Sequence, residues 1–105
     1  MGHKDDKIYE GTELKYLLNI EGDGFDMDAE NFDVTFVGEK GTVKIRKSDM
    51  VSNGNGKYYV LVNTALLGAG VLKAIVTAHI SDPDFPDGLR DEVYVIPRLD
   101  VIYEA

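Results

Sequence analysis

The chain has 105 residues, enough for one domain, and contains no cysteine, which excludes a disulfide framework and a thiolate metal site. Its formal net charge of −8 argues against binding to nucleic acid through a basic surface. No apolar run approaches the ~18 residues that a membrane-spanning helix needs, so we expect neither a nucleic acid nor a membrane as a partner.

The chain divides into three predicted parts. Residues 1–10 are charged at their start and are predicted to form a flexible arm. Residues 11–96 alternate apolar and polar side chains with the period of two that half-buried strands show. Residues 97–105 are predicted to be a C-terminal strand or a tail that docks onto a partner. The predicted strands cover residues 12–20, 32–37, 43–46, 57–62, 71–80, 93–96 and 101–103.

Turn signals separate these strands. Residues 38–41 read as a hairpin connection, and residues 53–56 supply two Asn-Gly pairs that tolerate positive φ. Residues 48–50 are predicted to form one helical turn capped by Ser48. About seven short strands at this spacing predict an all-β fold, a single antiparallel β-sandwich of the immunoglobulin-like kind, with a small closed barrel as the alternative.

Two acidic loops, at residues 21–31 and 81–89, raise the question of a calcium site. Counted from Asp26, the sixth and twelfth positions are Asn31 and Val37, so the helix-loop-helix calcium motif fails. A calcium site formed jointly by the two loops remains an alternative. The simpler interpretation is that these acids are solvated turn residues. Because solvated acids are the simpler reading, no metal or other cofactor is expected. The acids concerned are Asp26, Asp28, Glu30, Asp82, Asp84 and Asp87.

Catalytic motifs are poorly represented. His79 lies within a predicted strand, and the serines Ser48, Ser52 and Ser81 lack the G-x-S-x-G context of a nucleophile elbow. We therefore expect His79 to be hydrogen-bonded to a neighbouring residue. We expect the chain to have no catalytic residue, no small-molecule substrate and no enzyme activity. The short glycine repeats at 22–24, 54–56 and 68–70 lack a strand-to-helix phosphate-binding context and read as turns.

One basic cluster stands out in this acidic chain: Lys40, Lys44, Arg46 and Lys47. Its simplest interpretation is a solvated strand face that discourages edge pairing. The alternative is a contact with an acidic patch on another copy of the protein.

Residues 63–74 contain a Thr-x-x-Leu-Gly-x-Gly corner followed by a long strand of alternating small and apolar residues. A Lys-x-x-Met stretch at 47–50 and a Tyr-Tyr-Val-x-Val stretch at 58–62 precede it. This pattern, together with residues 82–90, resembles the N-terminal immunoglobulin-like domains of tailed-phage baseplate and fibre proteins. The likeness covers about residues 11–96, and its motifs are structural.

The resemblance implies a non-catalytic structural protein of a phage particle. Relatives of that kind often continue into a fibre, whereas this chain stops, which favours a capsid auxiliary or decoration protein or an adaptor. The implied partners are other virion structural proteins and another copy of the chain. The implied location is the virion, assembled in the host cytoplasm.

Docking by strand addition would use apolar residues of the two terminal segments. These partner-binding candidates are Ile8, Tyr9, Ile96, Leu99, Val101, Ile102 and Tyr103. On this basis, deletion of residues 97–105 is expected to leave a folded domain and to weaken assembly.

The alternative function is a carbohydrate- or cell-surface-binding module. Sugar sites in β-sandwiches stack exposed aromatic rings against the sugar. The aromatic candidates are Phe25, Tyr58, Tyr59 and Phe85, and the chain has no tryptophan.

Overall fold

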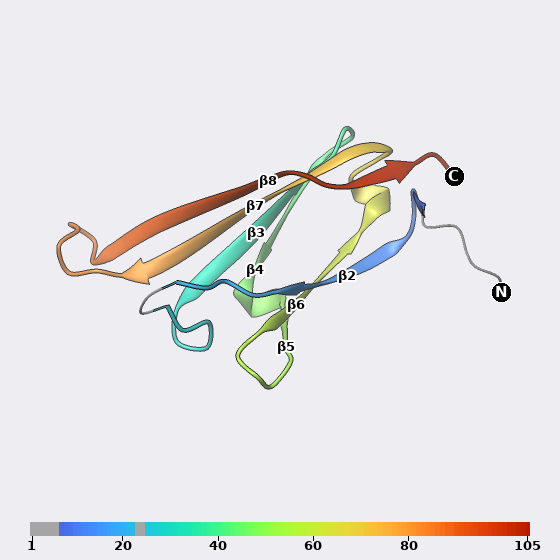
Figure 1. The fold of residues 1–105 in the computed structure, drawn as a ribbon. Coiled ribbons are helices and arrows are strands. Elements are labelled where there is room, and N and C mark those ends of the chain that lie inside the picture. The colour runs from blue at the N-terminus through green and yellow to red at the C-terminus, as the bar shows by residue number, and fades with distance from the viewer. Residues whose placement is uncertain (1–6, 23–24) are drawn as a thin grey trace.

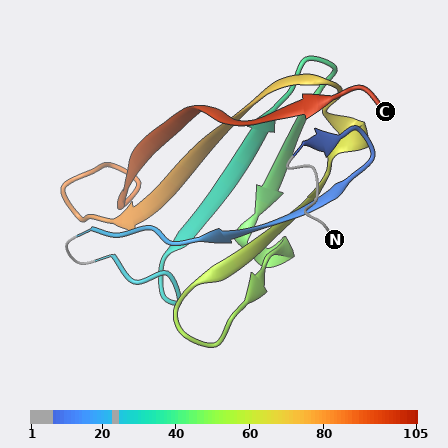
Figure 2. The same ribbon diagram turned by 45° about the vertical axis from the view of Figure 1, so that its right-hand side comes forward.

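A computed structural model describes residues 7–22 and 25–105, and it shows an all-β chain built from two sheets. The larger sheet has five strands in the order β1-β8-β7-β3-β4, and the smaller has three in the order β2-β6-β5 (Figures 1 and 2). The strands are β1 Ile8–Tyr9, β2 Glu13–Leu18, β3 Asn31–Val37, β4 Thr42–Arg46, β5 Val51–Ser52, β6 Tyr58–Asn63, β7 Gly70–Ser81 and β8 Leu89–Tyr103.

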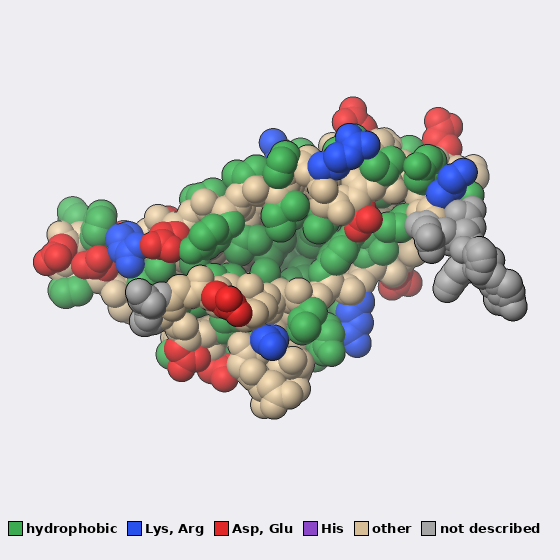
Figure 3. Space-filling model, viewed as in Figure 1, with side chains coloured by type: hydrophobic (Ala, Val, Ile, Leu, Met, Phe, Trp, Pro, Cys, Tyr) green, Lys and Arg blue, Asp and Glu red, His purple; other side chains and the backbone are tan. Residues whose placement is uncertain are grey.

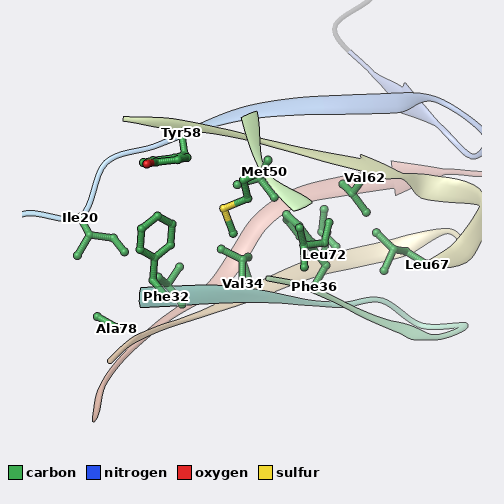
Figure 4. Close-up of a cluster of buried hydrophobic side chains, with 14 of the residues drawn as sticks. Ile20, Phe32, Val34, Phe36, Met50, Tyr58, Val62, Leu67, Leu72 and Ala78 are labelled. Atoms are coloured by element: carbon green, nitrogen blue, oxygen red, sulfur yellow. The ribbon is translucent and has the colours of Figure 1, made fainter. Parts of the chain in front are cut away.

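The alternation seen in the sequence places one face of each long strand in a shared core. Along β7, Leu72, Ala74, Val76 and Ala78 are buried while the residues between them are partly exposed. Side chains from β3 meet side chains from β6 and Met50 between the sheets (Figure 4). The buried core comprises Ile20, Met27, Phe32, Val34, Phe36, Ile45, Met50, Tyr58, Val60, Val62, Leu67, Leu72, Ala74, Val76, Ala78 and Ile102.

The two predicted strands at 93–96 and 101–103 are one strand, β8, which pairs with β7 in antiparallel fashion. The register passes from Ala74 opposite Ile96 to Leu72 opposite Asp100, so three residues of β8 face one of β7. Pro97 lies in this bulge. Because a proline cannot donate to the ladder, a bulge is where a strand can contain one without ending.

The last residues of the predicted flexible arm, residues 1–10, form a strand in the structure. Residues 1–6 lie outside the described residues, but Ile8 and Tyr9 form β1, which runs parallel to β8 opposite Ile102 and Tyr103. The Glu10 amide continues this contact by donating to the Tyr103 carbonyl at 2.8 Å. Ile8 packs against the core, which holds the strand in place. The larger sheet is therefore mixed rather than purely antiparallel.

No helix among residues 7–22 and 25–105 has the length and hydropathy to cross a membrane. Two short 3₁₀ turns connect strands. The first, η1 at Lys47–Asp49, confirms the predicted helical turn, although it starts one residue earlier than predicted. The predicted cap by Ser48 is wrong, because no side chain caps this turn. The predicted hairpin at 38–41 is confirmed, since it joins β3 to β4 and the Gly38 amide donates to the Gly41 carbonyl at 2.9 Å.

The second turn, η2 at Thr64–Leu66, fastens β1 and β2 to the rest of the chain. Thr64 is fully buried, and its hydroxyl donates to the Thr12 carbonyl at 2.8 Å and accepts from the Gly11 amide at 2.9 Å. Thr64 thus satisfies main-chain groups at the point where the chain crosses from one sheet to the other.

The residues after Thr64 show why this corner needs leucine and glycine. Leu67 is fully buried in the core, and its carbonyl accepts from the Lys40 amide at 2.8 Å. Gly68 has a φ of +81°, a conformation that residues with side chains rarely adopt. A Cβ on Gly38 would collide with the Leu67 carbonyl oxygen. The corner motif is thus explained by close backbone packing.

Deletion of residues 97–105 is expected to abolish cooperative unfolding, which reverses the expectation drawn from the sequence. The deletion removes Ile102, which is 2% exposed in the core, and the whole pairing partner of β1. Thermal melting followed by circular dichroism measures this. Deletion of the exposed residues 104–105 is the control and leaves the melt unchanged. A cooperative melt of the longer deletion near the full-length temperature would contradict the structure.

Thr64→Val is expected to lower the free energy of unfolding by about 1–3 kcal/mol, because it leaves the Gly11 amide without its acceptor. Urea denaturation measures the change. Thr42→Val at an exposed position serves as the matched control, with a change within about 0.5 kcal/mol. Equal stabilities of the two variants would show that the Thr64 hydroxyl is not needed.

Candidate functional site

Strand β8 presents four consecutive exposed hydrophobic residues. Val93 is 58% exposed, Tyr94 39%, Val95 54% and Ile96 40%. Since successive side chains of a strand point to opposite faces, both faces of β8 are apolar here. Exposed apolar residues that lie next to one another often mark an interaction surface, whereas single exposed apolar residues are common on protein surfaces.

The same stretch lies on an unpaired sheet edge. One side of β8 pairs with β7, whereas its other side pairs only with β1, at Ile102 and Tyr103. Residues 89–101 have no strand on that side within the part of the chain that the structure describes (Figure 1). Such an edge carries main-chain donors and acceptors that can pair with an added strand.

The ladder with β7 decides which way each side chain points. Ile96 lies opposite Ala74 and Tyr94 opposite Val76, so both are on the face that looks toward the smaller sheet. Val93 and Val95 are on the outer face of the larger sheet. The outer face and the inner face of β8 therefore offer two separate apolar contacts.

The structure distributes the partner-binding candidates between core and surface. Ile102 is in the core and pairs with Ile8, so this side chain is occupied within the chain. Ile8 and Leu99 are half-buried and pack against the core, and Val101 is half-buried. Binding of a partner by these four residues stays a prediction.

Tyr9, Tyr103 and Ile96 are the exposed members of the predicted set, at 40%, 42% and 40%. The two tyrosines lie on the β1–β8 pair. Their rings lie next to each other, 6.3 Å apart between centroids. Among the predicted docking residues, Ile96 belongs to the exposed β8 run. The sequence shows four consecutive apolar residues at 93–96, but residues 58–62 form a longer apolar run, so the pattern alone does not single out the exposed one.

The aromatic residues proposed for sugar stacking do not form a platform. Tyr58 is buried, lies edge-on to Phe32 with centroids 5.3 Å apart, and donates to Asp28 at 2.7 Å. Phe25 is half-buried against Phe32. Phe85 is exposed, at 43%, in the loop between β7 and β8. Tyr59 lies beneath the Lys15 ammonium, 4.2 Å from its ring centroid.

His79 is held between two carboxylates on the outer face of the larger sheet. Its Nε2 is 3.0 Å from Asp33 Oδ2 and its Nδ1 is 2.7 Å from Asp91 Oδ1. Lys44 Nζ lies 3.9 Å from the same Asp33 oxygen. The hydrogen bond to Asp33, then that to Asp91, raises the pKa of His79 above its ordinary value of 6.5.

This arrangement opposes a role for His79 as a general base. A cavity of about 360 Å³ beside it is lined by Ser48, Asp33 and Lys44 among others. A base needs a ring nitrogen that can accept a proton, but both nitrogens of His79 are bonded to carboxylates that favour the protonated ring. The geometry is that of a structural ion cluster, in which His79 links β3 and β8 across β7.

The acids of the two loops are engaged in local contacts. Glu30 accepts from the Ser81 amide at 3.2 Å, and Asp82 accepts from Arg90 at 3.1 Å. Lys47 Nζ donates to the Asp28 and Glu30 carbonyls at 3.0 and 2.8 Å. Within residues 7–22 and 25–105, no three His, Asp or Glu side chains converge as metal ligands.

Comparison with known proteins identifies no relative: no family model, no curated protein and no solved structure matches this chain.

His79→Gln is expected to destabilise the protein more at about pH 5.5 than at about pH 9. Because the pKa of His79 is raised on folding, its stabilising effect is complete below its ordinary pKa of 6.5 and is lost as the pH rises through the folded value. Urea denaturation of both proteins at the two pH values measures this. Lys57→Gln, a change outside the His79 cluster, is the control and is expected to show no such dependence on pH. A difference for His79→Gln that grows with pH would contradict the cluster.

Proposed function

We propose that this chain is a non-catalytic structural module that binds another protein along the exposed edge of β8. The observation that carries the proposal is the run of four exposed hydrophobic residues, 93–96, on an edge that no described strand covers. An added strand would form main-chain hydrogen bonds along this edge, and the alternating side chains would select the partner.

The apolar edge is costly to keep without a partner. Natural edge strands are often protected by charged residues, proline or bulges, because open edges pair with other chains. In β8, the charged residues Arg90 to Glu92 lie before the run, and Pro97 with its bulge lies after it. The middle of the edge carries no such protection, which supports its use as a binding surface.

The finer fold in this proposal is an immunoglobulin-like β-sandwich. In that fold one sheet contains strands A, B, E and D, and the other contains C, F and G, to which variable-type domains add C′. The order β2-β6-β5 and the order β8-β7-β3-β4 correspond to these two sheets. The short β1 joins the second sheet beside β8 before the chain crosses to β2. One core shared by both sheets supports the same interpretation.

The proposed setting is a phage particle, with other virion structural proteins as partners. This part rests on the resemblance of residues 47–50, 58–62 and 63–74 to immunoglobulin-like domains of phage tail proteins. The engagement of both His79 nitrogens supports the non-catalytic part of the proposal. The scattered aromatic residues leave the carbohydrate-binding alternative without a supporting observation.

The proposal predicts that the chain cosediments with particles purified on a density gradient from a lysed host culture. Val95→Lys is expected to reduce the amount of chain per particle at least about tenfold, because it places a charge in an apolar contact. Mass spectrometry of the particle fraction measures both.

The matched control is Leu66→Lys, which makes the same change at a residue 58% exposed and outside β8. This variant remains on the particle in the wild-type amount. Absence of the wild-type chain from particles would contradict the phage setting. Equal loss of both variants would contradict binding through β8.

A further inference from the structure

A groove runs between the edge of β8 and the edge of β2. It consists of two adjacent cavities, of about 260 and about 110 Å³, which share Leu18, Val76 and Ile96 in their linings. Figure 3 shows this side of the molecule, with hydrophobic side chains lining a hollow between the two strands. Core residues such as Phe36 and Val60 form part of its floor.

Both walls of the groove are strand edges. β2 is an edge strand of the smaller sheet. On the side of β8 away from β7, residues 89–101 pair with no strand within the described part of the chain. The inward-facing Tyr94 and Ile96 and the half-buried Leu99 line the β8 side. The groove thus exposes apolar core side chains and, next to them, main-chain groups able to pair.

The chain itself shows how such a groove is filled. At one end of the same edge, β1 pairs with β8 in parallel, and its Ile8 packs against the core. A strand that continues the line of β1 would lie over Leu99 and then Ile96. The residues of this chain that precede β1 are poorly suited to that place, because residues 1–6 contain a single hydrophobic residue, Met1.

Acidic side chains lie at both ends of the groove. Glu21 and Glu92 are near one end, and Asp100 at the other end accepts a hydrogen bond from Tyr16 across the gap between the sheets. The Tyr94 hydroxyl first, and Arg90 second, lower the pKa of Glu92. Because Glu92 is already ion-paired with Arg90, Glu21 is the acid at this end whose charge a ligand can meet. Glu21 is exposed at the rim. These positions favour a ligand with an apolar centre and basic ends.

We propose that the groove binds an extended segment of another protein, with apolar side chains at alternate positions and basic residues at both ends, as a strand added to residues 89–96 of β8, on the same edge that β1 uses beyond the Pro97 bulge. This inference rests on the protein-binding function proposed above and names the chemistry of the partner. The segment covers the apolar floor with its inward side chains and satisfies the β8 edge with its main chain.

The test uses the full chain and a short fluorescent peptide, Lys-Lys-Val-Thr-Val-Thr-Val-Lys-Lys. Fluorescence anisotropy is expected to show saturable binding that weakens with salt. Replacing all four lysines of the peptide by glutamate is expected to weaken binding at least about tenfold, and a proline at the central valine abolishes it. Amide hydrogen exchange of residues 89–96 slows when the first peptide is bound.

Variants of the protein locate the binding. Ile96→Lys is expected to weaken binding of the lysine-flanked peptide at least about tenfold, with Leu66→Lys as the matched control that binds like the wild type. Glu21→Lys changes an exposed rim residue without risk to the core. It is expected to weaken the lysine-flanked peptide and to strengthen the glutamate-flanked one.

Three results would overturn the inference. The first is that the lysine-flanked peptide shows no saturable binding. The second is that it binds but neither Ile96→Lys nor Glu21→Lys changes its affinity. The third is that sedimentation shows a concentration-dependent dimer that excludes the peptide, because the occupant of the groove would then be a second copy of the chain. If the peptides fail while particle association still depends on Val95, the groove is wrong and the proposed function stands. If the peptides bind but the chain is absent from particles, the phage setting is wrong and the groove stands.

Discussion

The ladder between β7 and β8 is the contact on which the rest of the structure depends. It connects the most regularly buried strand of the core to a strand that runs the full length of the larger sheet. Through this ladder β8 supplies Ile102 to the core, pairs with β1 and carries Asp91 to His79. Among the described residues, the other edge of β8 has only β1 beside it, and the proposed function uses the remainder of that edge.

A strand held on one side combines rigidity with an open hydrogen-bonding edge. The β7 side fixes which β8 residues face inward and which face outward, so the exposed side chains keep a defined geometry. The bulge at Pro97 limits the regular part of the edge, since it interrupts the alternation after Ile96. The proposed binding surface is therefore short, preorganised and bounded by the same features that shape the sheet.

The polar clusters of this protein are explained by its architecture. Thr64 satisfies main-chain groups where the chain changes sheets, and Asp100 links β8 to Tyr16 of β2. On the outer face, His79 of β7 joins Asp33 of β3 and Asp91 of β8. These polar groups are hydrogen-bonded to one another, which is how buried and partly buried polar groups are usually retained in folded proteins. None of them leaves an unsatisfied group aimed at a substrate among the described residues.

The sequence by itself determined the all-β class, most strand positions and the inward faces, because alternation with period two follows directly from strand geometry. It also indicated a turn at residues 68–70, where Gly68 has a positive φ, whereas the contacts of Leu67 with Gly38 and Lys40 come from the tertiary structure. Only the tertiary structure decided that β8 passes through Pro97, that Ile8 pairs with Ile102, and that no described strand pairs with the outer edge at residues 93–96. Strand neighbours and bulges depend on contacts between residues far apart in the chain, and local patterns do not specify those contacts.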